Sequence, residues 1–484
     1  MNTLLRKDLD SFKEILSHTV DVAQQHFDRQ ESLPPGRFIP DISMEDLPQK
    51  GIGAKAVLDH FEEKFATQLA NSTGPRYFGF VTGGSTPASV AGDWLVSAYD
   101  QNACGSNDSI APQLERQTIH FFKQLFGLDH EYFGSFVTGA TLANFTNLAL
   151  ARQWVGEQHG IDFSNDGLAN SVPLKVFSAT PHSSIMKSLS MLGIGRKAIV
   201  KVATLVDREA IDIHALEESL KQNRGPVIVV ANAGTVNTVD FDDLMAIGKL
   251  RMKYNFWLHV DAAFGGFAAC SEKYAHYLQG INHADSITID AHKWLNVPYD
   301  AAMQFTRHKD IQLRVFQNSA AYLGDPEKSP DYFHYTPENS RRFRALPSWF
   351  TLMAYGKEGY REIIERNCDV AFHFGELIKT SDDFKLLAPV RMNVVCFTLA
   401  QDDRTTDTIS QFLEAIRDDG RVFFTPTVYQ GIPAIRAAIS NWLTQKQDID
   451  LAYEVLQKCK PKKKSRPHRL INRNTLMNCF SNKA

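Results

Sequence analysis

The chain has 484 residues, 43% of them hydrophobic and 22% charged, which is ordinary for a globular protein and excludes a fibrous or disordered chain. No stretch reaches the roughly 20 apolar residues of a membrane span, and the charged start lacks the apolar core of a secretory signal. We therefore expect a cytoplasmic protein that does not use a membrane.

The net charge of −3 is unevenly distributed along the chain. Residues 458–484 hold nine Lys or Arg and no acidic residue, so the rest of the chain is acidic. An acidic body argues against nucleic acid as a partner. The six cysteines form no CxxC pair, and no His cluster has metal-ligand spacing, so we expect reduced thiols and no metal site.

In chain order, residues 1–74 show apolar residues at helical spacing and are predicted to be a helical segment that packs on a partner. Residues 75–354 alternate short apolar runs with helical patterns, which predicts a large α/β domain built on a mostly parallel sheet. The expected strands of that domain are GSFVTGA, LKVFSAT, GPVIVVANAGT, FWLHVDAA and DSITIDAH.

Residues 355–457 are predicted to form a smaller α/β domain, and residues 458–484 a basic, disordered tail. The smaller domain has candidate strands in FKLLAP, VVCFTLA, RVFFTPT and PAIRAAIS. Ligands of a parallel sheet bind at the carboxyl ends of its strands, which is where the unusual residues of this chain cluster.

The most informative segment is SITIDAHKW, in which an apolar strand leads directly to Lys293. An amine shielded from water is a competent nucleophile for Schiff-base formation. Taken alone, a lysine after a strand is usually a surface residue. The assignment therefore depends on its context.

A second strand, WLHVDAAFGG, ends at Asp261 and is followed by the small residue Ala263. Pyridoxal 5′-phosphate (PLP) needs a carboxylate at its ring nitrogen, because a protonated ring is an electron sink. Ala263 would let the flat ring approach the backbone. In isolation, a turn or helix-capping role is the commoner one for such an Asp.

A third segment, GSFVTGATLAN, passes from a strand through small and hydroxyl residues into a helix. Free backbone N–H groups and the helix dipole make such a junction a candidate phosphate site, although the segment matches no GxGxxG or Walker motif. The candidate phosphate residues are Thr138, Gly139, Ala140 and Thr141.

Two further strand ends add His182, in FSATPHSS, and Thr235, in ANAGT. An imidazole at position 182 could stack on the ring opposite Ala263, although a lone His is more often structural. Thr235 could hydrogen-bond the phenolic oxygen of the cofactor or the stacked imidazole. Five modest signals at successive strand ends are jointly improbable by chance.

At this point the sequence resembles the group II PLP-dependent decarboxylases of fold type I, which include aromatic L-amino-acid, histidine, glutamate and 2,4-diaminobutyrate decarboxylases. HVDAAFGG, DAHKWL and FSATPHSS resemble that family's blocks, and the likeness runs from about Tyr77 to about Leu456. The resemblance implies Lys293 for the internal aldimine, Asp261 for the ring nitrogen and His182 for stacking. It also implies Thr138, Ala140, Thr141 and His292 for the phosphate region.

The resemblance also implies a homodimer in which a loop of the neighbouring subunit brings a tyrosine over the site to donate a proton. Counting back from SRRFR, the matching position is Tyr332, with His334 and Tyr335 as neighbouring alternatives. Related aldehyde synthases carry Phe there. Tyr332 therefore favours simple decarboxylation.

The substrate remains open between two branches of the family. AGDWL and SIAP resemble the glutamate branch, whereas RRFRAL resembles the aromatic and histidine branch. Ser340 stands where aromatic-specific members usually have Gly and resembles the histidine-specific ones. The segment YFGFVTGGSTP, which includes Thr82, is expected to line the carboxylate side of the pocket. An aromatic or imidazole amino acid is slightly favoured over an acidic or diamino acid.

Two other functions are compatible with the same residues. Another fold type I reaction, such as transamination or carbon–carbon lysis, would use the same cofactor site, because PLP assists the cleavage of any bond to the α-carbon. A non-catalytic protein that kept the fold is the second alternative. The presence of Lys293, Asp261 and His182 argues against it.

Overall fold

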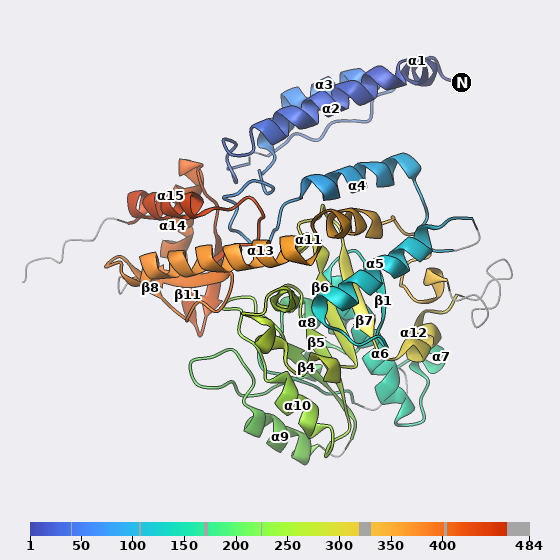
Figure 1. Ribbon diagram of the computed structural model, residues 1–484, viewed down its shortest axis with the longest axis vertical. Coiled ribbons are helices and arrows are strands. Elements are labelled where there is room, and N and C mark those ends of the chain that lie inside the picture. Colours follow the sequence, from blue (N-terminus) through green and yellow to red (C-terminus); the bar gives the residue numbers. More distant parts are fainter. Residues whose placement is uncertain are drawn as a thin grey trace, which may run out of the picture.

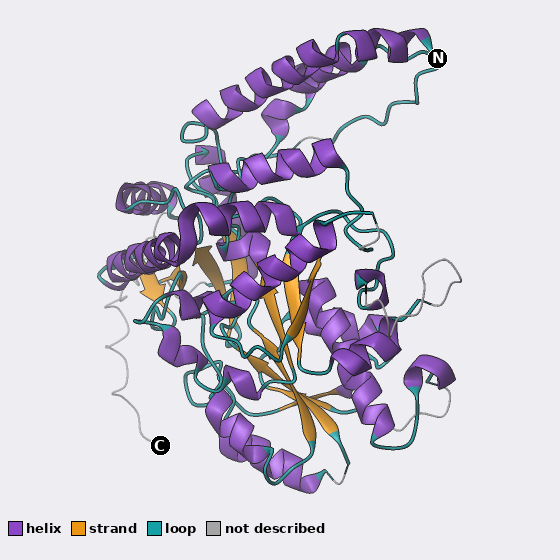
Figure 2. Ribbon diagram, turned by 45° about the vertical axis from the view of Figure 1, so that its right-hand side comes forward, coloured by secondary structure: helices purple, strands orange, loops and turns teal. Residues whose placement is uncertain are grey.

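The computed structural model describes residues 1–39, 41–105, 108–168, 173–223, 225–318, 331–400 and 404–461 (Figure 1). In that part of the chain a seven-stranded and a four-stranded sheet are surrounded by helices, and a pair of long helices stands apart at the amino-terminal end (Figure 2).

The large sheet has the strand order β1-β7-β6-β5-β4-β2-β3. Neighbouring strands from β3 to β6 are parallel, whereas β7 runs antiparallel to both β6 and β1. The prediction of a mostly parallel α/β sheet is confirmed. The strands are β1 Phe133–Val137, β2 Val176–Ser178, β3 Ile199–Lys201, β4 Val227–Asn232, β5 Phe256–Asp261, β6 Ser286–Asp290 and β7 Ala302–Thr306.

The central strands β4, β5 and β6 are buried along their whole length, which explains their continuous apolar sequences. Each ends in a polar residue: Asn232, Asp261 and Asp290, respectively. Asn232 is in register with Asp261, and Asp261 with Thr288. The parallel arrangement therefore gathers polar side chains at one edge of the sheet.

Helices cover both faces of this sheet, and α6 packs against β5, β6 and β7. The α-helices of this part are α4 Pro87–Tyr99, α5 Ala111–Phe126, α6 Ala140–Glu157, α7 Phe163–Asp166, α8 Ser183–Met191, α9 Ile213–Gln222, α10 Leu244–Leu250, α11 Ala291–Trp294 and α12 Lys309–Phe316. The short 3-10 helices of the chain are η1 Ala66–Gln68, η2 Arg196–Ala198, η3 Gly265–Cys270, η4 Ala275–Leu278, η5 Ile281–His283 and η6 Tyr332–His334.

The small sheet is antiparallel, in the order β10-β11-β9-β8, and has an apolar core of its own. Its elements are α13 Ala345–Lys379, β8 Phe384–Leu386, β9 Val394–Leu399, α14 Thr406–Asp419, β10 Thr425–Tyr429, β11 Ile432–Ala438 and α15 Lys446–Cys459. Helix α13 continues across the predicted domain boundary at 354/355 and is kinked at Gly356. The domain boundaries stay predictions, and the tail beyond residue 461 lies outside the described residues.

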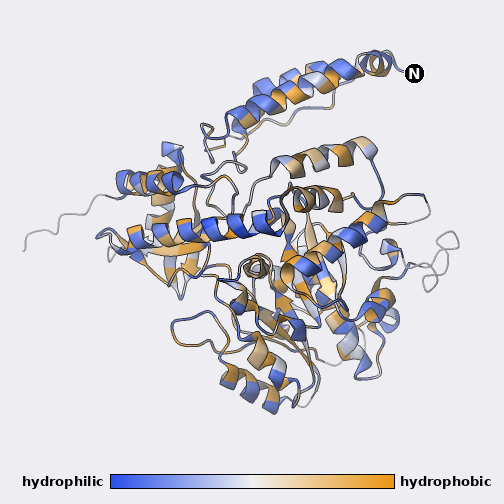
Figure 3. Cartoon of the chain, in the orientation of Figure 1, coloured by the Kyte–Doolittle hydropathy of each residue, from blue (hydrophilic) through white to orange (hydrophobic). Residues whose placement is uncertain are grey.

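The amino-terminal helices are α1 Thr3–Asp10, α2 Phe12–Asp28 and α3 Ala54–Lys64. Helix α3 begins only at Ala54, because the preceding segment contains Pro48, Gly51 and Gly53. Hydrophobic and hydrophilic residues are interspersed along these helices, as the hydropathy colouring shows (Figure 3). No helix among the described residues has both the length and the apolar character needed to cross a bilayer.

Candidate active site

A cavity of about 420 Å³ lies at the carboxyl ends of the large-sheet strands. Five of the predicted cofactor residues line it together: His182, Thr235, Asp261, Ala263 and Lys293. They come from the ends of four strands that are far apart in the sequence. The cavity therefore combines an amine, a carboxylate and an imidazole.

Lys293 lies in α11, directly after strand β6. Its Nζ is 3.6 Å from Asp290 Oδ2 and 5.7 Å from the centre of the Phe264 ring. The segment containing Gly83 passes so close that an added Cβ there would lie 1.7 Å from the Lys293 carbonyl oxygen. Glycine at position 83 is thus required for this approach to the Lys293 backbone.

Asp261 is held by hydrogen bonds to both carboxylate oxygens. Oδ1 accepts from the Ala263 backbone N–H at 3.2 Å, and Oδ2 accepts from Asn144 Nδ2 at 3.0 Å. The residue is only 6% exposed. A fixed carboxylate that lines the cavity suits a protonated ring nitrogen.

His182 follows β2 and caps helix α8. Its Nδ1 accepts a hydrogen bond from the Ser184 backbone N–H at 3.2 Å. Burial lowers the pKa of His182 below 6.5, so the ring is neutral near pH 7. A neutral imidazole and Ala263 on the wall of one cavity are suited to enclosing a flat ring.

Two of the predicted phosphate residues, Ala140 and His292, contact Asp290 at the amino terminus of α6. The Ala140 backbone N–H donates to Asp290 Oδ2 at 3.2 Å, and His292 Nε2 lies 3.1 Å from Asp290 Oδ1. The Thr138 and Thr141 hydroxyls make no hydrogen bond to any described residue, so both are available to a ligand.

Gly139 and His292 also lie at this junction. An added Cβ at Gly139 would lie 3.2 Å from His292 Cε1, so the junction is tightly packed. Burial lowers the pKa of His292, whose Nδ1 accepts from the Ala301 N–H at 3.2 Å. Asp290, to which the sequence analysis gave no role, contacts both the Ala140 N–H and His292 at this junction.

Thr235 lines the cavity, but its hydroxyl donates to Glu209 Oε2 at 2.5 Å. The same carboxylate accepts from Thr238 Oγ1 at 2.7 Å and from Asn237 Nδ2 at 3.2 Å. Thr235 Oγ1 also accepts from the Asp240 N–H at 2.9 Å. The Thr235 hydroxyl thus donates its proton to Glu209, and its predicted hydrogen bond to the cofactor or to the imidazole stays a prediction.

Glu209 and Arg436 are cavity residues that the sequence analysis missed. Arg436, on β11, donates to the Val236 carbonyl at 3.2 Å, and its Nε has no hydrogen-bond partner among the described residues. Burial lowers its pKa. An arginine inside the apolar strand PAIRAAIS was the available signal for it, whereas Glu209 lies in a loop without any pattern.

The remaining predicted residues do not line this cavity in the single subunit: they are the phosphate candidates described above and Thr82, Tyr332 and Ser340. Thr82 Oγ1 is 3.3 Å from the Tyr299 hydroxyl, and Ser340 is exposed. The Tyr332 ring is buried, with its centre 5.0 Å from the guanidinium carbon of Arg341, and burial raises its pKa well above 10. The roles of Thr82, Tyr332 and Ser340 stay predictions.

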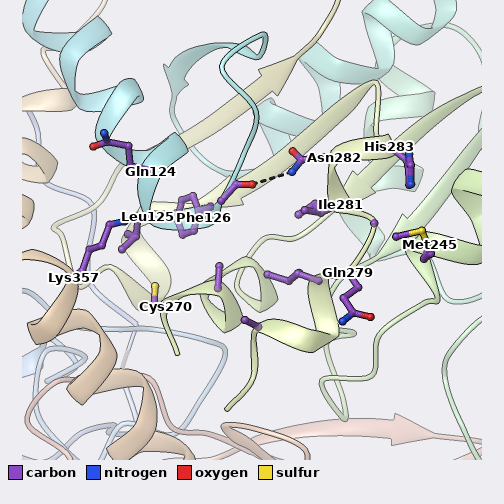
Figure 4. A pocket seen from close by; sticks show the side chains of 15 residues that line it. Gln124, Leu125, Phe126, Met245, Cys270, Gln279, Ile281, Asn282, His283 and Lys357 are labelled. Atoms are coloured by element: carbon purple, nitrogen blue, oxygen red, sulfur yellow. Dashed lines mark hydrogen bonds between the residues drawn. The ribbon is translucent and has the colours of Figure 1, made fainter. Parts of the chain in front are cut away.

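A second cavity, of about 510 Å³, shares no lining residue with the first. It is bordered by residues such as Phe126, Cys270 and Lys357, and Asn282 on its wall donates to the Gly127 carbonyl at 2.9 Å (Figure 4). Burial keeps the Cys270 thiol protonated by raising its pKa. This cavity lacks the combination of groups found around Lys293.

Comparison with known proteins identifies the family. Residues 35–400 match the pyridoxal-dependent decarboxylase conserved domain. The chain belongs to this family. Its cofactor is therefore PLP, and the protein is a PLP-dependent amino acid decarboxylase by family.

Individual relatives agree with this assignment. An aromatic-L-amino-acid decarboxylase of Bacillus atrophaeus is 28% identical over 85% of this chain and 86% of its own length. A 4-hydroxyphenylacetaldehyde synthase of Rhodiola rosea is 25% identical over 94% of this chain and 96% of its own. The structure of Oryza sativa TDC with PLP and tryptamine superposes with a TM-score of 0.86, at 22% identity, over 93% of this chain and 97% of that one. The last likeness confirms the fold type I architecture.

Proposed function

We propose that this pyridoxal-dependent decarboxylase converts an L-amino acid to the corresponding amine and CO₂, with aromatic or imidazole side chains slightly favoured. The observation that carries the proposal is the joint presence of Lys293, Asp261, His182 and Ala263 on one cavity wall. Relatives named for aromatic substrates support the preference.

In this proposal each group has a distinct task. Lys293 would hold PLP covalently, Asp261 would keep the proton on the ring nitrogen, and His182 would stack on the ring. Bound PLP supplies an electron sink for the charge left when CO₂ departs. Arg436 offers a buried cation to a carboxylate, since its Nε is unpaired among the described residues. The Ala140 end of α6, with Thr138 and Thr141, would receive the phosphate.

We also propose a homodimer. Five apolar residues at helical spacing on α1 and α2 are 47% to 63% exposed: Leu5, Leu9, Phe12, Leu16 and Val20. An exposed apolar stripe of this kind is typical of a surface that is buried against another protein surface. The exposed Ser340 could act in the site of a second subunit, whereas Tyr332 is buried in its own subunit and would have to move to do so. A cytoplasmic location stays a prediction, supported by the free thiols of the five described cysteines.

An aldehyde synthase is the second candidate, because such enzymes occur among the relatives. The test is to supply PLP-loaded protein with aromatic, imidazole, acidic and diamino L-amino acids, and to measure CO₂, amine, aldehyde and keto acid. Equal amounts of CO₂ and amine are expected from an aromatic amino acid or histidine, and none from the Lys293→Ala control. Keto acid without CO₂ would contradict the proposal, and aldehyde with CO₂ would establish the second candidate.

A further inference from the structure

One buried side chain, Asn144 of helix α6, connects two groups of the cavity. Its Nδ2 lies 3.0 Å from Asp261 Oδ2 and 3.0 Å from Ser184 Oγ, and Ser184 Oγ lies 2.7 Å from His182 Nδ1. Asn144 is completely buried. Because a carboxylate only accepts hydrogen bonds, the amide NH₂ must face Asp261.

A chain of hydrogen bonds leads from Trp257 to the side-chain oxygen of Asn144. Trp257 Nε1 lies 2.9 Å from Ser286 Oγ, which lies 2.9 Å from His259 Nδ1, and His259 Nε2 lies 2.9 Å from Asn144 Oδ1. An indole N–H only donates and an amide oxygen only accepts. The Ser286 hydroxyl therefore donates to Nδ1, and the proton of His259 is on Nε2. Burial lowers the pKa of His259 to about 4, so its ring is neutral, as this chain requires.

All donors in the chain consequently point from Trp257 toward the cavity. Asn144 passes its two N–H bonds to Asp261 and to Ser184, and the Ser184 hydroxyl donates to His182 Nδ1. The Ser184 backbone N–H donates to the same nitrogen at 3.2 Å. His182 Nδ1 thus accepts twice, and the proton of the neutral ring is on Nε2.

We propose that Asn144 is a positioning residue: one amide orients the Asp261 carboxylate and, by directing the Ser184 hydroxyl to Nδ1, adds to the Ser184 N–H in holding His182 as the Nε2–H tautomer. The inference rests on the proposed function only in taking Asp261 and His182 as the groups that face PLP. It means that Asp261 and His182 are coupled through the Asn144 side chain. A change at Asn144 alters both, although its side chain does not line the cavity.

The test is Asn144→Asp, which replaces the amide donor by an acceptor. The new carboxylate would repel Asp261 and accept the Ser184 proton, which reverses the direction of that hydrogen bond. In ¹⁵N spectra of full-length, histidine-labelled protein without PLP, wild-type His182 should show a bare Nδ1 and a protonated Nε2. The variant should show a shifted Nδ1 signal, because the Ser184 hydroxyl no longer donates to this nitrogen and only the Ser184 N–H does. The signal is assigned by its loss in His182→Gln.

PLP affinity is the second measurement. Asn144→Asp should weaken PLP binding roughly 10- to 100-fold, the effect of losing a hydrogen bond to a charged group. Asn147→Asp is the matched control, since Asn147 is equally buried on α6 and donates only to the Ile287 carbonyl and Thr288 Oγ1. It should keep the wild-type His182 signal and PLP affinity.

Ser184→Ala is a milder variant that tests the same proposal even if Asn144→Asp does not fold. The Nδ1 signal of His182 should shift because one of its two donors is lost, whereas Ser188→Ala, on the same helix, should leave it in place. A protonated Nδ1 in the wild type, or an unchanged signal in both Asn144→Asp and Ser184→Ala, would overturn the proposal. Since these spectra need neither PLP nor substrate, a failure to decarboxylate would count against the proposed function alone.

Discussion

Tyr332 and Tyr335 lie one turn apart and are both buried, but their surroundings differ. Tyr332 packs on Arg341, whereas the Tyr335 ring packs on Phe133, 4.8 Å between centres, and faces Lys309. If Tyr332 is the proton donor, Tyr332→Phe should lower amine formation at least ~100-fold, the usual contribution of a general acid. Amine and aldehyde produced by the purified, PLP-loaded protein are quantified by mass spectrometry.

Tyr335→Phe is the matched control for this experiment, because it removes the same hydroxyl one turn away. It should form amine at nearly the wild-type rate. The opposite pattern, with activity lost only in Tyr335→Phe, would transfer the proton-donor role to Tyr335.

His259 makes the stability of the protein depend on pH. Its pKa is about 4 in the folded chain and 6.5 in an exposed histidine, so the unfolded chain binds a proton more readily. Its contribution to the free energy of unfolding is therefore present above pH 6.5 and lost as the pH falls toward about 4, by roughly 3 kcal/mol. Urea midpoints between pH 7.5 and 4.5 should fall less steeply for His259→Gln than for the wild type. Equal slopes would refute this role for His259.

The chemistry-bearing residues at strand ends could be predicted from sequence because their positions follow from the sheet itself. Asp261 ends strand β5, and Lys293 follows the adjacent parallel strand β6. Recognising the two strands is therefore sufficient to predict that these residues lie close together. Glu209 and Arg436 reach the cavity from a loop and from the small sheet. Their approach depends on packing between distant segments, which no local pattern encodes.

At the scale of elements, the kink of α13 depends on Gly356. Its φ of 57° and ψ of −166° lie in a region that favours glycine, and an added Cβ would meet no atom within 4 Å. Gly356→Ala should therefore lower stability through backbone strain alone, by about 1–3 kcal/mol. Thermal unfolding measures the effect. Gly225→Ala should change little, because its φ is not positive and an added Cβ would be in ordinary van der Waals contact, 3.8 Å from His159 Nε2. A similar loss in both variants would rule out strain as the cause.

Apolar runs located the buried strands well, but not the strands whose patterns are weak. The expected strands at β1, β2, β4, β5 and β6 are all present, whereas β3 and β7 were not predicted. Strand β3 has only three residues, and β7 contains a buried Gln304 whose amide donates to Ser135 Oγ at 2.9 Å. Strand β10 begins at Thr425, later than the apolar run RVFFTPT suggests, because Phe423 forms only an isolated parallel bridge to Tyr77 instead of joining the small sheet.

At the scale of the whole molecule, the exposed stripe on α1 and α2 predicts how the subunits associate. Replacing Leu9 and Leu16 by Asp should weaken the dimer at least roughly tenfold per leucine, since each buries an apolar side chain on association. Lys13→Asp, on the exposed surface of the same helices, is the control. In sedimentation equilibrium, the leucine variants should dissociate to monomers, whereas the wild type and Lys13→Asp should remain dimers. A wild-type protein that is monomeric and active would contradict the dimer.

The whole account depends on Lys293 as the residue that carries PLP. The most direct measurement is borohydride reduction of the PLP-loaded protein, followed by peptide mapping by mass spectrometry. The account predicts a phosphopyridoxyl group on the peptide containing Lys293 in the wild type, and no such group anywhere in Lys293→Ala. Labelling of a different lysine in the wild type, or labelling that persists in Lys293→Ala, would contradict it.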